Sequence, residues 1–361
     1  MQEIVGAIHG HSTYSDGTGS FPEILAAAQA AGLDFLAMTD HDTLQPLQDI
    51  GEGFHGKTLL LIGCEVSPPT NHLLALGAST CPSRDQPPQD YIDELRAQGA
   101  LTFLAHPHDR GVPLAKIPSY RWDAWPIDRY TGIEVWNHLS DWSGNLGKLP
   151  HALRGVVKPH SFLAGPEAET LALWDEAGRT RRVVGIGGLD VHDVRIGRRP
   201  LQLRVFPYPF AFRALLCHVL VPDWPPALED AKTALLAAVA AGRLYFANHA
   251  MGDPRGLAFR GLTAAGDEAV QMGDECEAPG PRRLQLTAPR AADLRILRDG
   301  QVIAHSFGRD LACEVGGAGV YRAELRIRRG GRLYPWAFTN PIYIRRAPGA
   351  AVKAAAADRW R

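Results

Sequence analysis

The sequence predicts an α/β barrel followed by an antiparallel β-sandwich, and three observations support this fold class. Short apolar runs of strand length alternate with helical segments in the first part of the chain. Histidines and acidic residues follow directly after most of these runs. Further on, helical periodicity gives way to short stretches of alternating apolar and polar residues. We therefore expect a barrel over residues 1–252, a small β-sandwich domain over 253–346 and a C-terminal tail over 347–361.

The first apolar run, residues 4–8, is predicted to be a strand that ends in His9-Gly10-His11. Side chains two apart project to the same side of a strand, so His9 and His11 would aim at one point. Such a pair can bind a metal ion, because imidazole is a common metal ligand. An isolated His-x-His is more often a partly exposed pair at a strand end than a metal site. The other motifs of the chain determine which interpretation applies here.

Alternating strands and helices follow. Ser20 to Glu23 indicates a capping box with a proline in the first turn, residues 24–31 are rich in alanine, and Gly32 is a stop signal. Strands alternating with helices favour a parallel sheet, and so many units in a long chain favour a closed barrel. We expect strands at 34–38, 58–62, 71–77, 100–105, 132–136 and 182–188, and helices at 88–98, 167–177 and 227–241.

Side chains of metal-ligand type come just after the predicted strands. In (β/α) barrels the C-terminal strand ends converge on one face, where active sites lie. Residues far apart in the sequence are therefore expected to meet there. They include His41, Asp42, Glu65, His106, His138, Asp190, His192 and Asp193.

The segment 253–346 lacks helical periodicity. Strands are predicted at 283–287, 293–297, 319–328 and 334–344, and Asp299-Gly300 indicates a hairpin turn. This pattern is typical of an antiparallel β-sandwich. The sequence does not decide whether this module binds a partner, mediates homo-oligomerisation or caps the barrel.

Composition narrows the functional classes. Lys and Arg total 38 and Asp and Glu 39, for a net charge of −1, so no global field favours nucleic acid or a membrane surface. The five cysteines are scattered without a C-x-x-C, which argues against a disulfide framework or a thiolate zinc site. With no apolar run long enough to span a bilayer and no room for a leader, we expect a cytoplasmic protein acting on a small molecule.

Together these motifs resemble the PHP (polymerase and histidinol phosphatase) family of metal-dependent hydrolases, over roughly residues 4–195. Each motif follows a predicted strand, and the order matches. The resemblance implies a distorted (β/α)7 TIM-like barrel, the PHP fold, with two or three divalent metals at its C-terminal face. The matching pieces are His9-Gly10-His11-Ser12, Ser15-Asp16-Gly17, Thr39-Asp40-His41-Asp42, Gly63-Cys64-Glu65, Ala105-His106-Pro107 and Leu189-Asp190-Val191-His192.

The resemblance also implies a ligand set. A first metal would be bound by His9, His11, Glu65 and Asp190; a second by bridging Glu65 and His106; a third by Asp16, His41 and His192. A further family histidine corresponds to Asn137 or His138, and the sequence leaves that choice open. Mixed imidazole and carboxylate ligands suit Zn, Mn or Fe equally.

Closely spaced divalent cations lower the pKa of a bound water and so permit hydrolysis. Asp42, His192 and Asp193 are the catalytic candidates. The aspartates, and Asp40 beside them, are proton shuttles, imidazole-orienting groups or simple caps.

Several other residues keep two interpretations. His72 faces the site or is a satisfied buried histidine, whereas the safer interpretation of His108, His151 and His160 is surface histidines. Arg154, Lys158 and Arg195 bind a phosphate or are solvated cations. Gly185 to Gly188 is expected to allow close packing near the metals, since no nucleotide-binding helix follows.

The leading hypothesis is a phosphoesterase acting on a small phosphorylated metabolite or nucleotide. One alternative is a carboxylic or carbamate ester hydrolase, with an apolar pocket near Trp136, Trp142 and Trp174. The other is a PHP module retained for interaction without catalysis.

Overall fold

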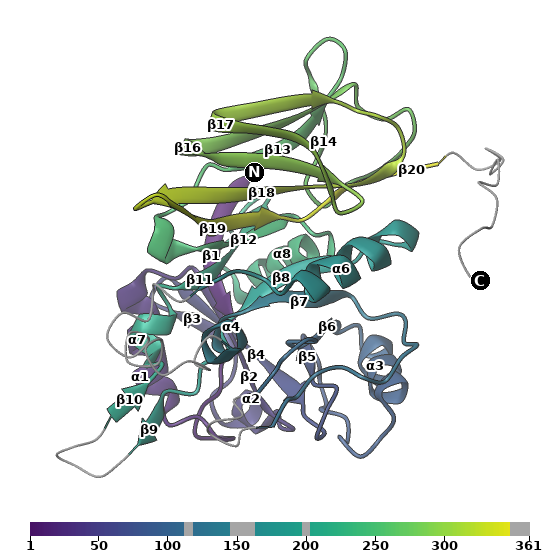
Figure 1. Ribbon diagram of the computed structural model, residues 1–361. Helices are drawn as coiled ribbons and strands as arrows, with labels where there is room; N and C mark the ends of the chain where they lie inside the picture. Colours follow the sequence, from purple (N-terminus) through teal and green to yellow (C-terminus); the bar gives the residue numbers. More distant parts are fainter. Residues whose placement is uncertain (112–117, 145–162, 197–202, 347–361) are drawn as a thin grey trace.

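The computed structural model describes residues 1–111, 118–144, 163–196 and 203–346. Figure 1 shows an N-terminal unit of strands and helices beneath a layer of long, mostly antiparallel strands near the C-terminus. The fold is thus a two-part, mixed α/β structure built around one large sheet.

Seven strands of the N-terminal unit are hydrogen-bonded neighbours in chain order. The end of β8 returns to the end of β1, because Leu189 N donates to Ile8 O (3.0 Å) and Gly10 bridges Val191. The strands are β1 (Gln2–Ile8), β2 (Phe35–His41), β4 (Thr58–Val66), β5 (Leu73–Leu76), β6 (Leu101–Leu104), β7 (Gly132–Asn137) and β8 (Val184–Gly188). The expected strands are therefore present, with shifted ends.

The expectation of a wholly parallel sheet is wrong at β5, which runs antiparallel to both β4 and β6. The connection over residues 67–72 is too short for a crossover helix, so the chain reverses in a hairpin. β11 (Leu215–Val221) is also antiparallel, pairing with β1 on one side and with β12 (Leu244–Asn248) on the other.

Helices cover the outside of this sheet. The predicted start of α1 (Phe21–Ala31) is confirmed: Ser20 N donates to Glu23 Oε2 (2.9 Å), and Gly32 ends the helix with a φ of 73°. The other helices are α2 (Gln45–Asp49), α3 (Pro88–Ala97), α4 (His138–Gly144), α6 (Ala168–Thr180), α7 (Tyr208–Ala211), α8 (Leu228–Ala240) and the 3-10 turn η4 (His249–Met251). Short strands β3 (Gly53–His55), β9 (Val194–Ile196) and β10 (Leu203–Val205) lie between them. Among the described residues, no helix has the length and apolar character needed to cross a membrane.

Over the described residues 258–345, the C-terminal part consists of strands and their connections. Its strands are β13 (Ala258–Leu262), β14 (Glu268–Gln271), β15 (Glu275–Glu277), β16 (Arg283–Arg298), β17 (Gln301–Glu314), β18 (Gly319–Arg329), β19 (Arg332–Thr339) and β20 (Ile342–Arg345). The two strands expected at 283–287 and 293–297 are one long strand, β16, with a register shift after Thr287. The predicted hairpin turn is confirmed, because Asp299 and Gly300 both have positive φ (51° and 81°) between β16 and β17.

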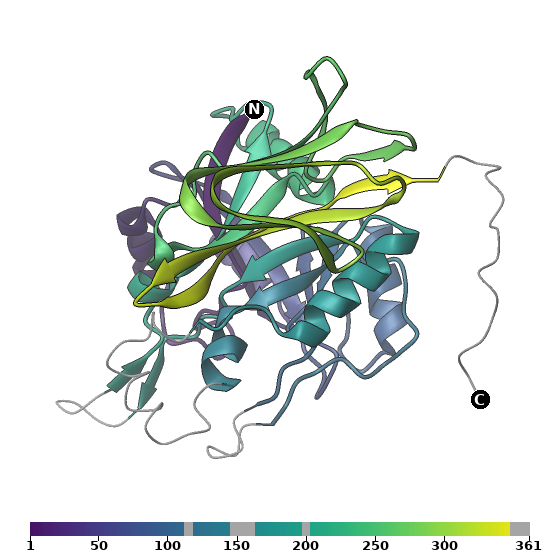
Figure 2. The same cartoon turned by 45° about the horizontal axis from the view of Figure 1, so that its top comes forward.

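The two parts share backbone pairing and packing. β12 pairs with β19, so the sheet continues from one part into the other (Figures 1 and 2). Of the two buried apolar clusters, the C-terminal one includes Tyr245 and Ala247 of β12, and the N-terminal one includes Phe338 of β19. A division near residue 252 therefore stays a prediction, since the contacts cross it.

Candidate metal centre

The first strand ends before the histidine pair that was expected to continue it. β1 ends at Ile8, and His9 adopts a left-handed backbone with a φ of 70°. The expected reason for alignment, side chains two apart on a strand, therefore does not apply. The two rings still meet, with centroids 5.1 Å apart, and both are fully buried.

Left-handed backbone recurs at the strand ends around this point. His9, Asp42, His106, Asp190 and Asp193 all have positive φ, between 29° and 70°. Such conformations are uncommon for residues other than glycine and cost of order 1 kcal/mol each. They persist where the surrounding structure holds them, and their concentration here marks this region as a candidate functional site.

Glu65, at the end of β4, is the centre of the arrangement. Its Oε2 lies 3.3 Å from His9 Nε2, 3.4 Å from His11 Nε2 and 3.0 Å from His41 Nδ1. Its Oε1 lies 3.0 Å from His72 Nδ1 and 3.2 Å from His106 Nε2. One buried carboxylate thus faces imidazoles from several strand ends.

Two further carboxylates extend the cluster. Asp190 Oδ1 lies 3.4 Å from His9 Nε2 and 3.3 Å from His11 Nε2. Asp16 Oδ1 lies 3.1 Å from His192 Nε2 and 3.5 Å from His41 Nε2. Four overlapping groups result, each with its ligand atoms within 4.8 Å of one another: His9, Glu65 and His106; His9, His11 and Asp190; His41, Glu65 and His72; and His11, Asp16, His41 and His192.

The donor atoms fit a divalent cation. His9 Nε2, Glu65 Oε2 and both ring nitrogens of His11 are buried without a hydrogen-bond partner among the described residues. Buried polar atoms are normally paired, so His9 Nε2 and His11 Nε2, each within 3.4 Å of the equally unpaired Glu65 Oε2, indicate a ligand. Burial, together with nearby His192 and His41, lowers the pKa of His11 to about 3, which keeps it in the neutral form that binds metals.

The imidazoles of the cluster stabilise the ionised form of its carboxylates. Burial opposes ionisation of Glu65 and Asp190, but His9 and the other imidazoles hold the pKa of both carboxyls well below the usual value. Burial likewise opposes a charge on Asp16, yet His192 lowers its pKa to about 2. The centre therefore presents ionised carboxylates, the oxygen ligands that divalent cations prefer.

Glu134, on β7, is a functional residue that the sequence analysis missed. Its Oε1 lies 2.7 Å from His9 Nδ1, and its Oε2 accepts hydrogen bonds from His106 N (2.7 Å) and Asn137 Nδ2 (2.9 Å). A carboxylate on Nδ1 sets that nitrogen as a donor and leaves Nε2, which faces Glu65, as the nitrogen that would bind a cation. An acidic residue inside an apolar strand was the available signal, because glutamate is almost never fully buried unless paired.

The sequence left open whether Asn137 or His138 takes the position of a further family histidine, and the two side chains lie in different surroundings. Asn137 Nδ2 lies 3.4 Å from Asp190 Oδ2 in addition to its bond with Glu134. The His138 ring instead packs against Phe206, with centroids 4.6 Å apart. Asn137 is thus the residue that adjoins the cluster.

The predicted catalytic aspartates lie outside the groups of close ligand atoms found in the described residues. Asp42 accepts a hydrogen bond from Ser67 N (2.8 Å), and Ser67 Oγ lies 2.6 Å from His41 Nδ1. The Asp193 carboxylate is buried and paired with the guanidinium of Arg204. Of the three catalytic candidates, only His192 belongs to the groups of close ligand atoms found in the described part of the chain.

Asp40 supports the loop that carries Asp16. It accepts hydrogen bonds from Ser12 N (2.6 Å), Ser12 Oγ (2.8 Å) and Ser15 Oγ (2.7 Å). These bonds connect the end of β2 to the segment between His11 and Asp16.

The other residues that the sequence analysis left with two interpretations differ in their distance from the cluster. His72 belongs to the cluster, and the Tyr120 ring packs on it at 4.9 Å. His108 is half-buried, and its Nδ1 lies 2.9 Å from Thr170 Oγ1. Arg195 is half-buried on β9. His151, Arg154, Lys158 and His160 lie outside the described residues.

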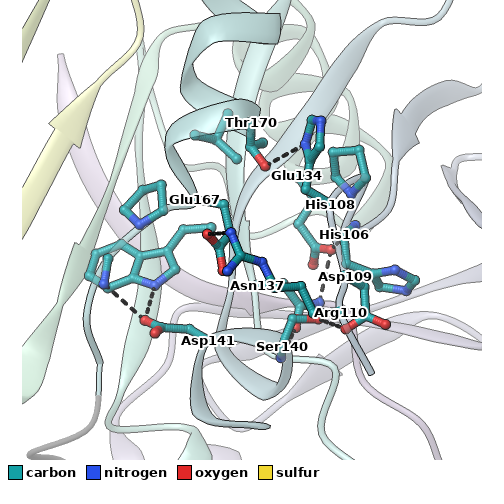
Figure 3. A pocket seen from close by; sticks show the side chains of 15 residues that line it. His106, His108, Asp109, Arg110, Glu134, Asn137, Ser140, Asp141, Glu167 and Thr170 are labelled. Carbon is teal, nitrogen blue, oxygen red and sulfur yellow. Dashed lines mark hydrogen bonds and ion pairs between the residues drawn. The ribbon is translucent and has the colours of Figure 1, made fainter. Parts of the chain in front are cut away.

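A small cavity adjoins the cluster behind His106 and Glu134. Figure 3 shows Arg110 paired with Glu167 and Ser140 bonded to Asp109 on its wall. Its volume of about 30 Å³ accommodates water but no organic substrate. Trp174 is buried in the core, where its Nε1 donates to Val183 O.

Solved structures that are similar to this chain include the following three. A two-domain protein from Bacteroides vulgatus ATCC 8482 that contains a predicted PHP-like metal-dependent phosphoesterase is 15% identical, with 94% of this chain and 95% of that chain covered and a TM-score of 0.43. A proposed metal-dependent phosphoesterase from Bifidobacterium adolescentis ATCC 15703 is 16% identical, with 52% and 87% covered and a TM-score of 0.30. An amidohydrolase from Chromobacterium violaceum with bound sulfate and no metal is also 16% identical, with 52% and 87% covered and a TM-score of 0.29.

Comparison with curated proteins gives no match. Residues 7–137 match the family model of the PHP domain. This range carries seven of the nine residues of the cluster, His9, His11, Asp16, His41, Glu65, His72 and His106. Residues 7–137 of this chain are therefore similar to the PHP domain family.

Proposed function

We propose that this protein is a metal-dependent hydrolase whose substrate is a phosphate ester of a small metabolite or nucleotide. The observation that carries the proposal is the convergence on Glu65 of imidazoles from five positions, His9, His11, His41, His72 and His106. A carboxylate with both oxygens engaged in this way suits a bridge between cations.

The ligand sets follow from the four groups of close atoms. His9, His11, Glu65 and Asp190 would bind one cation, and Asp16, His41 and His192 another. Glu65 with His106 would contribute to a further site, to which we add His72. When bound, such cations lower the pKa of water, act as Lewis acids and stabilise charge on the leaving oxygen. Zn, Mn or Fe would suit these ligands.

The protein's own groups orient the ligands. Glu134 holds His9 with Nε2 directed inward, and Asp190 O, 2.9 Å from His192 Nδ1, does the same for His192. Asp16 is the most exposed ligand, with 61% of its side chain accessible, against 24% for His41 and 13% for His192. Substrate would therefore approach from the side of Asp16.

The proposed fold around this centre is a distorted (β/α)7 barrel with a β-sandwich module. Seven neighbouring strands, β1, β2 and β4 to β8, support it, as does the hydrogen bonding that joins the ends of β8 and β1. The proposed division into 1–252, 253–346 and 347–361 accompanies this architecture.

The test is release of inorganic phosphate from a panel of phosphorylated metabolites and nucleotides, after loading with Zn, Mn or Fe. His11→Ala and Asp190→Ala should abolish it, whereas His305→Ala, at an exposed position on β17, should not. Turnover of p-nitrophenyl acetate but not p-nitrophenyl phosphate would identify an ester hydrolase instead. No turnover of any ester by metal-loaded protein would contradict the proposal and favour a non-catalytic module.

A further inference from the structure

A second group of ligand-type side chains lies at the opposite end of β1. His218 on β11, His249 at the start of η4 and Asp253 just beyond it have ligand atoms within 4.8 Å of one another. Glu3, which contacts His218, stands six residues before His9 on β1, or roughly 20 Å along an extended strand. This group is therefore separate from the centre around Glu65.

The two histidines face each other directly. His218 Nε2 lies 2.8 Å from His249 Nε2, and the rings stack with centroids 5.0 Å apart. The His218 side chain is fully buried. Two imidazole nitrogens this close either share one proton or bind a common cation.

The tautomer of His218 is set by its surroundings. His218 Nδ1 lies 2.8 Å from Glu3 Oε1, so Nδ1 is the donor and Nε2 presents a lone pair to His249. Glu3 is itself held by the Tyr245 hydroxyl and by Gly256 N (2.9 Å), while the Tyr245 ring stacks on His218 at 4.4 Å. A carboxylate behind an imidazole whose other nitrogen is free is the usual support of a metal-binding histidine.

Asp253 supplies the third donor, at the surface. Its Oδ1 accepts a hydrogen bond from Arg255 N (3.0 Å), and its Oδ2 pairs with Arg255 Nη1 (2.5 Å). The guanidinium of Arg255 therefore competes with any cation for this carboxylate. Burial lowers the pKa of both histidines, that of His249 to about 4, which leaves both in the neutral form that metals require.

We propose that His218 Nε2, His249 Nε2 and the Asp253 carboxylate bind one divalent transition cation of the zinc type, with water as a fourth ligand. Two imidazoles and a carboxylate are a common zinc donor set. In a tetrahedral site two nitrogens about 2.0–2.1 Å from zinc lie about 3.3 Å apart, so the rings need to separate by only about 0.5 Å.

The position of this site implies a structural role. Its ligands come from β11, from η4 and from the segment that leads to β13, and Glu3 adds the start of β1. In both views the N-terminal end of β1 lies beside the C-terminal strands (Figures 1 and 2). The cation would fasten the two parts of the chain at the point where one continues into the other.

Zinc titration of the chelator-treated full-length protein tests this site. His249→Gln should bind one zinc fewer than the wild type, Asp253→Asn should weaken that zinc at least tenfold, and both should keep any hydrolytic activity. Arg255→Ala should tighten it severalfold, because the competing guanidinium is removed. The matched control His305→Ala, on the exposed face of β17, should bind as the wild type does.

The same zinc count and affinity in His249→Gln and the wild type would overturn the proposal and leave a simple hydrogen bond between the histidines. If His249→Gln fails to fold, the surface variants decide, since unchanged zinc affinity in both Asp253→Asn and Arg255→Ala overturns it equally. Failure of phosphate release would not affect this result, because the readout is zinc binding.

Discussion

Nδ1 of His9 lies 2.7 Å from Oε1 of Glu134 in the interior of the protein. The pair joins the end of β1 to the middle of β7, and Glu134 extends the connection to the His106 backbone and to Asn137. Glu134 thus fixes the orientation of the His9 imidazole without itself belonging to the groups of close ligand-type atoms in the described residues.

Replacing this carboxylate should therefore impair metal binding. In Glu134→Gln the side chain keeps its shape but loses the charge that makes His9 Nδ1 a firm donor, so we expect metal affinity and hydrolysis to fall 10- to 100-fold. Elemental analysis and steady-state kinetics measure both. Glu169→Gln, at an exposed position on α6, is the matched control, and equal metal content in the two variants would contradict the role of Glu134.

Gly188 should act through the same bond. A Cβ at this position would stand 1.7 Å from Glu134 Oε1 and 3.1 Å from His9 Cβ, so Gly188→Ala would push the carboxylate away from His9. We expect a loss of hydrolysis similar to that of Glu134→Gln, and a double variant little worse than either single one, because both act on one contact.

Kinetics of the two single variants and the double variant measure this coupling. Gly308→Ala, where a Cβ meets nothing within 4 Å, should be neutral. Fully additive losses would show that Gly188 acts elsewhere.

Local sequence signals predicted much of the site, because strand ends and ligand residue types are both local properties. Glu65, His106 and Asp190 follow apolar runs, and these runs are strands. The capping box and Gly32 stop signal of α1 are local in the same way.

What the sequence did not reveal depends on contacts between distant segments. The left-handed φ of His9 is held where Asp190 N donates to His9 O, from a segment far along the chain. Glu134 has a role only because β7 places it behind His9, and Asp193 is removed from the cluster by Arg204. None of these relationships has a periodic or compositional signal.

The C-terminal part shows the same limit. β17 was not predicted, because both its faces are largely accessible and its apolar alternation is weak. The pairing of β12 with β19 crosses the predicted boundary, and backbone pairing is not visible in side-chain patterns.

Asn340 should be essential to the contact between the two parts. Its side chain accepts from Gly185 N (2.8 Å) and donates to Gly185 O (2.7 Å) and Leu244 O (3.0 Å), in the buried interior. Asn340→Ala removes the partner of Gly185 N and Gly185 O, while Leu244 O keeps its bond from the residue 340 backbone (3.2 Å), so we expect a cost of about 2–4 kcal/mol in the free energy of unfolding. Urea denaturation measures the loss, with exposed Gln301→Ala as the control. A loss below that of the control would show that water replaces the amide.

Asp141 should make stability depend on pH. Burial raises the pKa of this carboxyl to about 7, although Trp136 Nε1 (2.8 Å) and the Ala164 and Gly165 amides donate to it. In the unfolded chain an aspartate titrates near pH 4. Between about pH 4 and 7 the folded state therefore binds a proton that the unfolded state has released, so this contribution is complete below that window and is lost as pH rises through it.

The free energy of unfolding should consequently fall with rising pH over this window by up to about 1.4 kcal/mol per unit from this group. Asp141→Asn removes the titration and should change the slope in the positive direction, while exposed Asp267→Asn should keep the wild-type slope. Urea denaturation at pH 5 and pH 7 gives the slope for each variant. All other titrating groups are the same in Asp141→Asn and the wild type. Identical slopes in the two proteins would therefore mean that Asp141 ionises at its ordinary pKa in the folded protein.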